Sequence, residues 1–111
     1  MEFMEVVRER YSCKDYDSSR QVEKEKLDQI LEAGRLAPTA KSLQEQHIYV
    51  VQSEEGLAKI DKLTRCRYGA PTVLLVAFDK NNVFTYPGDK RDSGIEDAAI
   101  VATHLMLAAK D

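Results

Sequence analysis

The sequence predicts an α+β fold in which helices pack on a small central sheet. Three observations lead to this fold class. Residues 23–36 and 95–109 carry apolar side chains at helical spacing, whereas the runs at 47–52 and 71–78 are rich in β-branched and other apolar residues, and polar segments with turn-forming residues separate them. Because 111 residues can bury one modest core, we expect a single domain over residues 1–111.

The N-terminal part is predicted to hold two helices. In residues 2–9, Phe3, Val6 and Val7 recur at helical spacing and form one apolar stripe. Residues 10–21 are polar and predict an extended loop. A second helix over 23–36 should end near Pro38, because the residue before a proline disfavours helical backbone. The inward face of that helix is predicted to be Leu27, Ile30, Leu31 and Gly34.

The middle of the chain predicts two strands around a short helix. Residues 47–52, HIYVVQ, have strand composition, and Ser53 is placed to cap a helix that runs to about Leu63. Residues 71–78 form a continuous apolar run that Pro71 introduces. Such a run is typical of a strand that is covered on both faces, so we expect it at the centre of the sheet. Residues 79–92 contain turn residues and predict a loop.

The final helix is predicted to be apolar on nearly every side. Ser93 and Glu96 have the spacing of a capping box, and small or apolar residues then cover more than one stripe of residues 95–109. A single chain of this size can hardly surround such a helix. Two explanations remain open at this point: a partner subunit covers it, or the chain is a fragment whose continuation covers it.

Charge and composition exclude several classes of protein. The net charge is -3, with both signs mixed along the chain, which argues against a broad basic face for nucleic acid. The longest apolar run, near 98–109, is too short to span a bilayer, and the N-terminus does not resemble a secretory signal, so we expect a cytoplasmic protein. Cys13 and Cys66 lack metal-ligand spacing and are predicted to be free thiols.

Two short stretches carry candidate chemistry. In RYSCK, the side chains of Arg10, Ser12 and Lys14 would share one side of an extended chain, where two cations and a hydroxyl suit an anion such as a phosphate. The alternative is a solvated surface turn. In LAPTAKSLQEQ, small and polar residues between a helix and a strand would let a flat ligand approach the backbone, although an ordinary connection is the alternative. They are Pro38, Thr39, Ala40, Ser42 and Gln44.

Together the two stretches resemble the flavin-dependent nitroreductase family. Its Arg-x-Ser-x-Arg/Lys motif is matched by Arg10, Ser12 and Lys14. Its Ala-Pro-Ser-x-x-Asn-x-Gln-Pro-Trp motif is matched more loosely. Ala37, Pro38 and Gln44 agree with it, Thr39 and Ser42 replace its Ser and Asn, and Glu45 and Gln46 stand where Pro and Trp are usual. The order and spacing of the later strand and helix are also similar, so the resemblance covers Met1 to Asp111.

The resemblance implies an FMN-dependent oxidoreductase that works as an intertwined homodimer. NAD(P)H would donate electrons, and nitroaromatics, quinones or similar flat acceptors would receive them by a ping-pong mechanism. The family needs no catalytic side chain and no metal, because the cofactor carries the reaction. The first stretch would hold the phosphate and ribityl end of FMN, and the second would contact the ring from the neighbouring subunit. The cofactor-binding residues implied are Arg10, Tyr11, Ser12, Lys14, Pro38, Thr39, Ala40, Ser42 and Gln44.

The chain also departs from the family pattern. Family members usually continue for dozens of residues, with a glycine-containing turn, further strands and commonly a basic residue for the flavin phosphate. The alternative reading is therefore a non-catalytic flavin-binding or dimerisation module, or an inactive fragment. Arg65 and Arg67 could lie near the flavin or lower the pKa of the Cys66 thiol, or could be solvated surface residues. His104 is expected to be a hydrogen-bonded core or interface residue.

Overall fold

The computed structural model describes residues 1–88 and 91–111, and it contains every helix and strand that the sequence predicts, with bounds within two residues. The helices are α1 (Phe3–Glu9), α2 (Lys24–Arg35), α3 (Glu54–Leu63) and α4 (Gly94–Lys110). The strands are β1 (Gln46–Val51) and β2 (Val73–Phe78), and the 3-10 turns are η1 (Ala40–Ser42) and η2 (Lys80–Asn82). The predicted loop at 79–92 contains η2, and its residues 89–90 lie outside the described residues.

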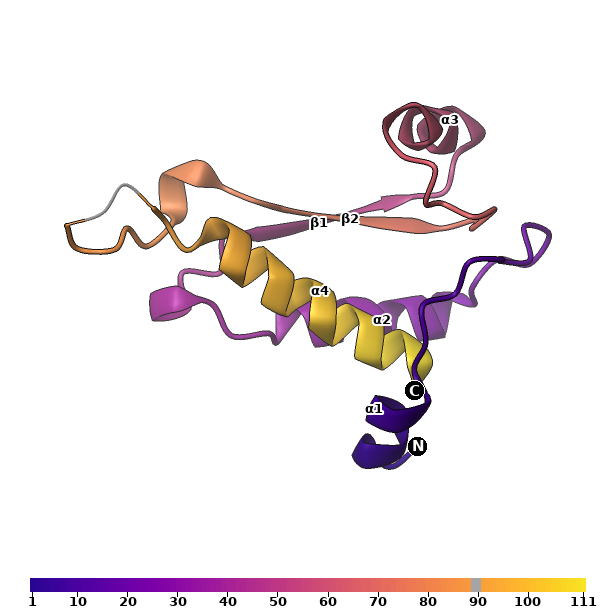
Figure 1. Cartoon of the computed structure of the whole chain (residues 1–111), viewed down its shortest axis with the longest axis horizontal. Coiled ribbons are helices and arrows are strands. Elements are labelled where there is room, and N and C mark those ends of the chain that lie inside the picture. Colours follow the sequence, from indigo (N-terminus) through magenta and orange to yellow (C-terminus); the bar gives the residue numbers. More distant parts are fainter. Residues whose placement is uncertain (89–90) are drawn as a thin grey trace.

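The two strands form an antiparallel pair with a layer of helices on one face (Figure 1). The register runs from Gln46 opposite Phe78 to Val51 opposite Val73. In Figure 1, α2 and α4 lie below this sheet, and α3 lies above one of its ends. Ser53 caps α3 as predicted, because its hydroxyl accepts a hydrogen bond from the backbone N–H of Gly56 at 3.0 Å.

The prediction that residues 71–78 form a central strand covered on both faces is wrong for the described part of the chain. There β2 pairs with β1 alone, so it lies at an edge of a two-stranded sheet. Leu74 and Val76 pack against the core on one face, whereas Leu75 on the other face is 48% exposed. The apolar run reports which side chains prefer burial, but not which element of the structure covers them.

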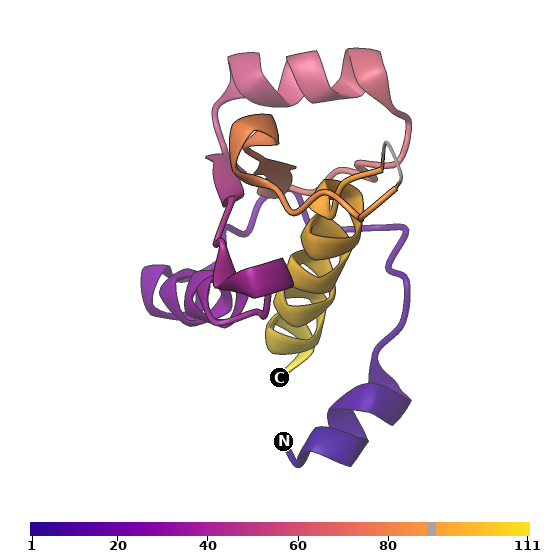
Figure 2. The same ribbon diagram turned by 90° about the vertical axis from the view of Figure 1, so that its left-hand side faces the viewer.

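The core lies between the sheet and the α2/α4 layer. Ala37, Val101 and Leu105 are its buried residues, and Ile30, Ile48, Leu74 and Val76 pack around them. Gly34 of α2 permits this packing. A Cβ atom at Gly34 would lie 2.7 Å from Leu105 Cδ2 and 2.8 Å from Ile48 Cδ1, both too close for a carbon contact. Figure 2 shows α2 and α4 on the same side of the sheet, with α1 beyond α4.

The start of α4 differs from the predicted capping box. Ser93 has helical backbone angles and makes no side-chain cap; its buried hydroxyl accepts a hydrogen bond from the backbone N–H of Phe84 at 3.1 Å. Asp92 takes the capping role, because its Oδ1 accepts from the N–H of Gly94 at 2.9 Å. Glu96 instead receives a hydrogen bond from the Tyr86 hydroxyl. The local Ser-to-Glu spacing could not show that tertiary partners compete for both side chains.

Much of the apolar surface of α4 remains open in the single chain. Val101 and Leu105 are buried, but Ile95 is 77% exposed, and Ile100 and Met106 are also exposed. His104 is half-buried and its Nδ1 lies 3.2 Å from the carbonyl oxygen of Ala33, as expected for a hydrogen-bonded residue. Within residues 1–88 and 91–111, no helix has both the length and the apolarity that crossing a bilayer requires.

Replacing Gly34 by Val should destabilise the fold by about 2 kcal/mol, because the added methyl groups would push Leu105 and Ile48 out of their packed positions. Urea unfolding measures this change. Gln29→Val introduces the same residue on the exposed side of α2 and should cost no more than about 0.5 kcal/mol. Equal decreases in the free energy of unfolding of the two variants would show that the close approach of α2 and α4 does not depend on Gly34.

Candidate functional site

The first candidate stretch leaves α1 as an exposed, extended segment. Arg10 ends α1 with extended backbone angles, and the side chains of Arg10, Ser12 and Lys14 are all exposed. Among the residues that the structure describes, neither Arg10 nor Lys14 is paired with a carboxylate. Tyr11 is exposed too, and the Lys110 ammonium lies 5.7 Å from its ring centroid. Two cationic groups are therefore free to bind an anion.

This segment runs beside the turn that follows α3. The backbone N–H of Tyr16 donates to the carbonyl oxygen of Tyr68 at 3.0 Å. Tyr68 and Gly69 both adopt left-handed backbone, with φ of 53° and 76°. A cleft of about 640 Å³ lies between the two segments, α2 and the end of α3, and Tyr16, Thr64, Cys66 and Arg67 are among its lining residues. This pairing joins residues far apart in the chain, so no local sequence pattern indicates it.

The Cys66 thiol, on this turn, is exposed and more acidic than an ordinary thiol. Hydrogen bonds from the Thr64 and Tyr68 hydroxyls lower its pKa, and the nearby charge of Lys14 adds to the effect. Of the alternatives for Arg65 and Arg67, a lowering of this pKa is not supported, since the groups that lower it are Thr64, Tyr68 and Lys14. Arg67 makes a bidentate ion pair with Asp61, at 2.7 and 2.8 Å, and also donates to the carbonyl oxygen of Ala70.

The second candidate stretch is a strained turn. Lys41, Ser42 and Gln44 each have φ of 54°, a left-handed conformation that costs free energy in residues other than glycine. The Thr39 hydroxyl holds the turn from inside by accepting a hydrogen bond from the N–H of Gln44 at 2.9 Å. Non-glycine residues in such backbone cluster at ligand sites, so the strain marks these residues as candidates for binding.

The exposed side chains of this turn offer hydrogen-bond donors, and a contact with Gln46 orients those of Gln44. Pro38, Ser42 and Gln44 are exposed, whereas Thr39 and Ala40 are half-buried. The Gln46 side-chain amide donates to Gln44 Oε1 at 2.9 Å. Because that contact occupies the oxygen of the Gln44 amide, its NH₂ group points its donors elsewhere and can serve a carbonyl or ring nitrogen.

A buried pair of carboxyl groups, which is not among the sites predicted from the sequence, lies directly beneath this turn. Glu45 is 1% exposed and Asp97 of α4 is 4% exposed. Asp97 Oδ1 accepts a hydrogen bond from the backbone N–H of Ala40 at 3.0 Å. A usable signal was present, because Asp97 precedes the buried Val101 and Leu105 by four and eight residues and therefore shares their face of α4.

The environments of the two carboxyl groups shift their pKa values in opposite directions. Burial raises the pKa of Glu45, and its hydrogen bond with Asp97 raises it further. Burial also acts to raise the pKa of Asp97, but hydrogen bonds from Glu45, Ser93 and the Ala40 N–H outweigh it and lower that pKa. The pair therefore favours one protonated Glu45 beside one ionised Asp97.

The two candidate stretches lie at opposite ends of α4. Ala40 bonds Asp97 near the start of that helix, whereas Tyr11 lies against Lys110 at its end. Thirteen residues separate Asp97 from Lys110, which corresponds to about 20 Å along the helix axis. In Figure 1 the turn at η1 and the segment after α1 accordingly appear at opposite sides of the molecule. One chain does not bring the two sets of residues together.

Comparison with known proteins identifies the family of this chain. The sequence profile described as the nitroreductase family matches residues 7–68, more than half of the chain. The chain belongs to the nitroreductase family. Both candidate stretches lie within the matched residues, and so does the turn that carries Cys66.

Solved nitroreductase structures share the fold. A nitroreductase family protein from Clostridium difficile 630 is 42% identical, with a TM-score of 0.92 over 99% of this chain and 63% of that one. A nitroreductase with bound FMN from Bacteroides fragilis NCTC 9343 is 24% identical, with a TM-score of 0.80 over 99% of this chain and 65% of that one. At that lower identity the likeness establishes the fold alone.

A curated relative leads to the same family. A protein of Methanothermobacter thermautotrophicus, with the provisional name NADH dehydrogenase/NAD(P)H nitroreductase, is 30% identical over 114 residues. The alignment covers 98% of this chain and 56% of that relative. The chain thus spans a little over half the length of the relative, and about three-fifths of the length of the two solved structures above.

Replacing Thr64 by Val should raise the pKa of the Cys66 thiol toward the ordinary value of 9.0, because one hydrogen bond to the thiolate is lost. At a fixed neutral pH, Cys66 should then react more slowly with iodoacetamide. Mass spectrometry follows the reaction, and Cys13 in the same molecule serves as the internal control. An unchanged Cys66 rate with an unchanged pH midpoint would show that Thr64 does not stabilise the thiolate.

Proposed function

We propose that this chain binds FMN and that two copies together act as an NAD(P)H-dependent oxidoreductase of the nitroreductase type. The observation that carries the proposal is that the family match at residues 7–68 includes both the strained turn at 38–44 and the cations at 10–14, which have no carboxylate partner among the described residues. FMN is bound in the Bacteroides fragilis protein of the same fold. The residues proposed to hold FMN are Arg10, Tyr11, Ser12, Lys14, Pro38, Thr39, Ala40, Ser42 and Gln44.

The first stretch fits the phosphate end of FMN. A phosphate carries a charge of about -1.5 to -2 at neutral pH and three acceptor oxygens. Arg10 and Lys14 are exposed and have no carboxylate partner among the described residues, so binding a phosphate would break no ion pair. Charge-assisted hydrogen bonds from these two groups, with one from Ser12, would neutralise the dianion.

The second stretch fits the ring end. The Gln44 NH₂ group is directed away from its own intramolecular contact, as described above, and the Ser42 hydroxyl is exposed beside it. The flavin ring offers carbonyl oxygens and ring nitrogens that such donors can bind. Thr39 and Ala40 are held by internal hydrogen bonds and would support the turn rather than reach far toward the ring.

The separation of the two stretches favours a site that two copies build together. One copy would provide Arg10 and Lys14 and the other would provide the 38–44 turn. A groove of about 670 Å³ between α1, α2 and α4 has a largely apolar lining that includes Phe3, Ile100 and Leu107. A second copy that covered this groove would also bury the exposed apolar side of α4, which a single chain leaves in water.

The chain would supply binding and orientation. When bound, FMN supplies hydride chemistry, accepting electrons from NAD(P)H and passing them to a nitroaromatic, a quinone or a similar flat acceptor in a ping-pong cycle. Arg10 and Lys14 would fix the phosphate, and the 38–44 turn would fix the ring so that donor and acceptor meet the same face in turn. We place this activity in the cytoplasm, where reduced nicotinamides are available.

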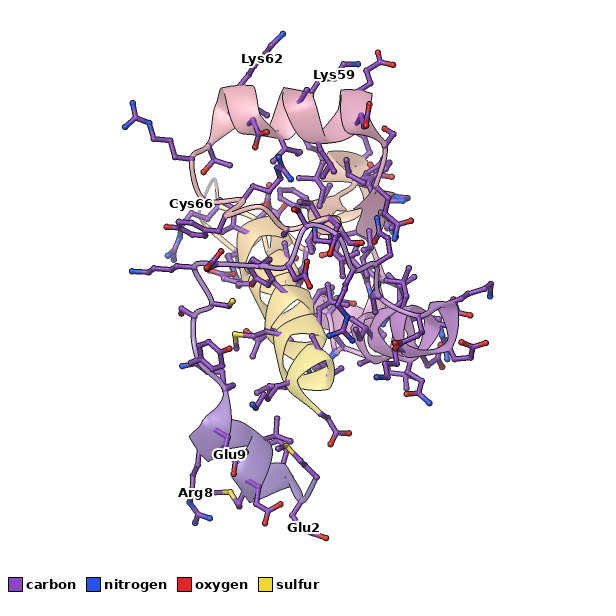
Figure 3. All side chains as sticks on the ribbon, turned by 90° about the vertical axis from the view of Figure 1, so that its right-hand side faces the viewer. Glu2, Arg8, Glu9, Lys59, Lys62 and Cys66 are labelled. Carbon is purple, nitrogen blue, oxygen red and sulfur yellow. The ribbon has the colours of Figure 1, made fainter. Side chains whose placement is uncertain are left out.

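Replacing Arg10 and Lys14 together by Ala should weaken FMN binding at least tenfold, because two charge-assisted hydrogen bonds worth about 1.5–3 kcal/mol each are lost. Flavin fluorescence titration measures the affinity. The double variant Lys59→Ala and Lys62→Ala makes the same change in net charge on the outer side of α3 and should bind FMN normally (Figure 3). Equal affinity in both double variants would contradict the phosphate assignment.

Mixing variants tests whether two copies share the site. The Arg10→Ala, Lys14→Ala variant and a Gln44→Ala variant each lack one half of every site. After unfolding and refolding as a mixture, half of the symmetric pairs contain one chain of each kind, and each such pair has one intact site. About a quarter of the wild-type FMN sites should then be recovered. If neither variant binds FMN by itself and the refolded mixture recovers no FMN sites, a shared site is ruled out.

Anaerobic stopped-flow mixing of the FMN-loaded chain with NAD(P)H should bleach the visible flavin absorbance, because the bound flavin takes up a hydride. Free FMN at the same concentration is the control. Steady-state assays at several acceptor concentrations should then give parallel double-reciprocal lines. Tight FMN binding without bleaching would mean that the chain is a flavin-binding module and not an oxidoreductase.

A further inference from the structure

The Glu45–Asp97 pair is more deeply buried than the surface that the proposed function uses. Both side chains are at least nine-tenths buried, and they connect three parts of the fold: the 39–44 turn, the start of β1 and the first turn of α4. The Ala40 N–H donates to Asp97 Oδ1, and the N–H of Asp79 donates to the backbone carbonyl of Glu45. Any change in the pair therefore acts directly on the turn above it.

Three buried oxygen atoms of the pair lack a hydrogen-bond partner among the described residues, and one proton between the two groups would satisfy two of them. Among residues 1–88 and 91–111, no donor reaches Glu45 Oε1, Glu45 Oε2 or Asp97 Oδ2. Two ionised carboxylates in this position would repel each other in a poorly solvated site. A proton on Glu45 removes one charge and lets Glu45 donate a hydrogen bond to the neighbouring Asp97 carboxylate.

We propose that Glu45 and Asp97 share one proton and that this proton holds residues 39–44 in the conformation that receives the flavin ring. Glu45 is thus a positioning residue, since it acts on the ligand through Asp97 and Ala40. The flavin part of the inference rests on the proposed function, whereas the shared proton can be judged without any ligand. The proton belongs on Glu45, because Asp97 already accepts hydrogen bonds from Ala40 and Ser93 that stabilise its charge.

The direction in which stability depends on pH follows from the pKa shifts of Glu45 and Asp97. The pKa of Glu45 is raised above its ordinary 4.5, so the stability that its protonated form contributes is complete below 4.5 and is lost as the pH rises through the raised value. The pKa of Asp97 is lowered below its ordinary 3.8, so its contribution is present above 3.8 and is lost as the pH falls through the lowered value. The shared proton is present between these two limits.

Other charged or titratable groups surround the pair and must stay constant in any test. Asp92 opposes ionisation of Glu45, and Tyr86 feels the charge of Asp97 while it bonds Glu96. The Lys41 ammonium lies 4.9 Å from the Phe84 ring centroid, and Arg91 lies 5.6 Å from that of Tyr86. The groups to be left unsubstituted are Lys41, Asp79, Tyr86, Arg91, Asp92 and Glu96.

Infrared spectroscopy of the flavin-free chain tests the shared proton directly. A protonated carboxyl group has a C=O band that is distinct from carboxylate and amide bands. In a pH titration, the wild-type chain should retain one such band beyond the pH at which the bands of exposed carboxyl groups vanish, because the pKa of Glu45 is raised, and the Glu45→Gln variant should lack it. Glu25→Gln, an exposed substitution of the same kind on α2, should keep the band. A wild-type chain whose last such band vanishes together with those of the exposed carboxyl groups overturns the inference.

The same variants test the link to the turn. The glutamine in Glu45→Gln can still donate to Asp97 but cannot lose a proton, so its turn should not respond to pH. At equal pH on the alkaline side of the titration, the amide hydrogen of Ala40 should exchange faster in the wild type than in Glu45→Gln. Equal exchange rates there would overturn the positioning role. Glu45→Ala should expose this amide throughout the pH range, and rescue by Gln separates the role from simple packing.

FMN titrations complete the test. On the acid side, wild type and Glu45→Gln should bind FMN equally, and about one pH unit beyond the loss of the infrared band the wild type should bind about tenfold more weakly. Comparing variants at one pH cancels the ionisation of the FMN phosphate itself. A constant ratio of the two affinities would overturn the flavin part of the inference. No FMN binding by any variant at any pH, with the band still present, would overturn the proposed function while the shared proton stands.

Discussion

The close packing of α2 against α4 at Gly34 is the constraint on which the rest of the structure depends. With no side chain at this position, Leu105 and Ile48 reach the backbone of α2, and the two helices form one layer beneath the sheet. That layer determines where both ends of α4 lie. One end lies against the 39–44 turn and the other lies against Tyr11, so the two candidate stretches are positioned by a single helix.

The cations of the described residues differ in whether a carboxylate holds them. Arg35 and Arg67 are held by carboxylates, and Arg67 also by a carbonyl, so these two guanidinium groups organise local structure. Arg10 and Lys14 have no carboxylate partner in the part of the chain that the structure describes. Exposed ion pairs contribute little to stability, so free cations at 10–14 cost the fold little and remain available for a ligand.

The sequence predicted the elements well because their signals are local. Apolar spacing located all four helices, strand composition located both strands, and Ser53 correctly marked the start of α3. The errors arose where a distant residue decides the outcome. The Ser93 hydroxyl accepts from the backbone N–H of Phe84 and caps no N–H of its own helix, and β2 lacks a second partner strand among the described residues, although its composition suits burial on both faces.

The candidate site, like the fold, was predictable where its signals are local. The motifs at 10–14 and 38–44 could be read directly from the chain, but the pairing of Tyr16 with Tyr68 and of Glu45 with Asp97 depends on contacts between residues far apart in sequence. Only Asp97 gave a periodic signal, as an acidic residue on an apolar helical face. A family motif thus located the surface of the site, while the buried groups that support it required the structure.

The left-handed residues of the 39–44 turn also bear on the thermodynamics of ligand binding. Folding has already restricted Lys41, Ser42 and Gln44 to a costly backbone conformation, and internal hydrogen bonds keep Thr39 and Ala40 in place. A loop that becomes ordered only on contact would lose conformational entropy with its ligand, typically about 1–2 kcal/mol for each residue that it fixes. In this protein that entropy is lost during folding, so association at the turn should carry a small entropic penalty and its selectivity should come from the shape of a preorganised surface.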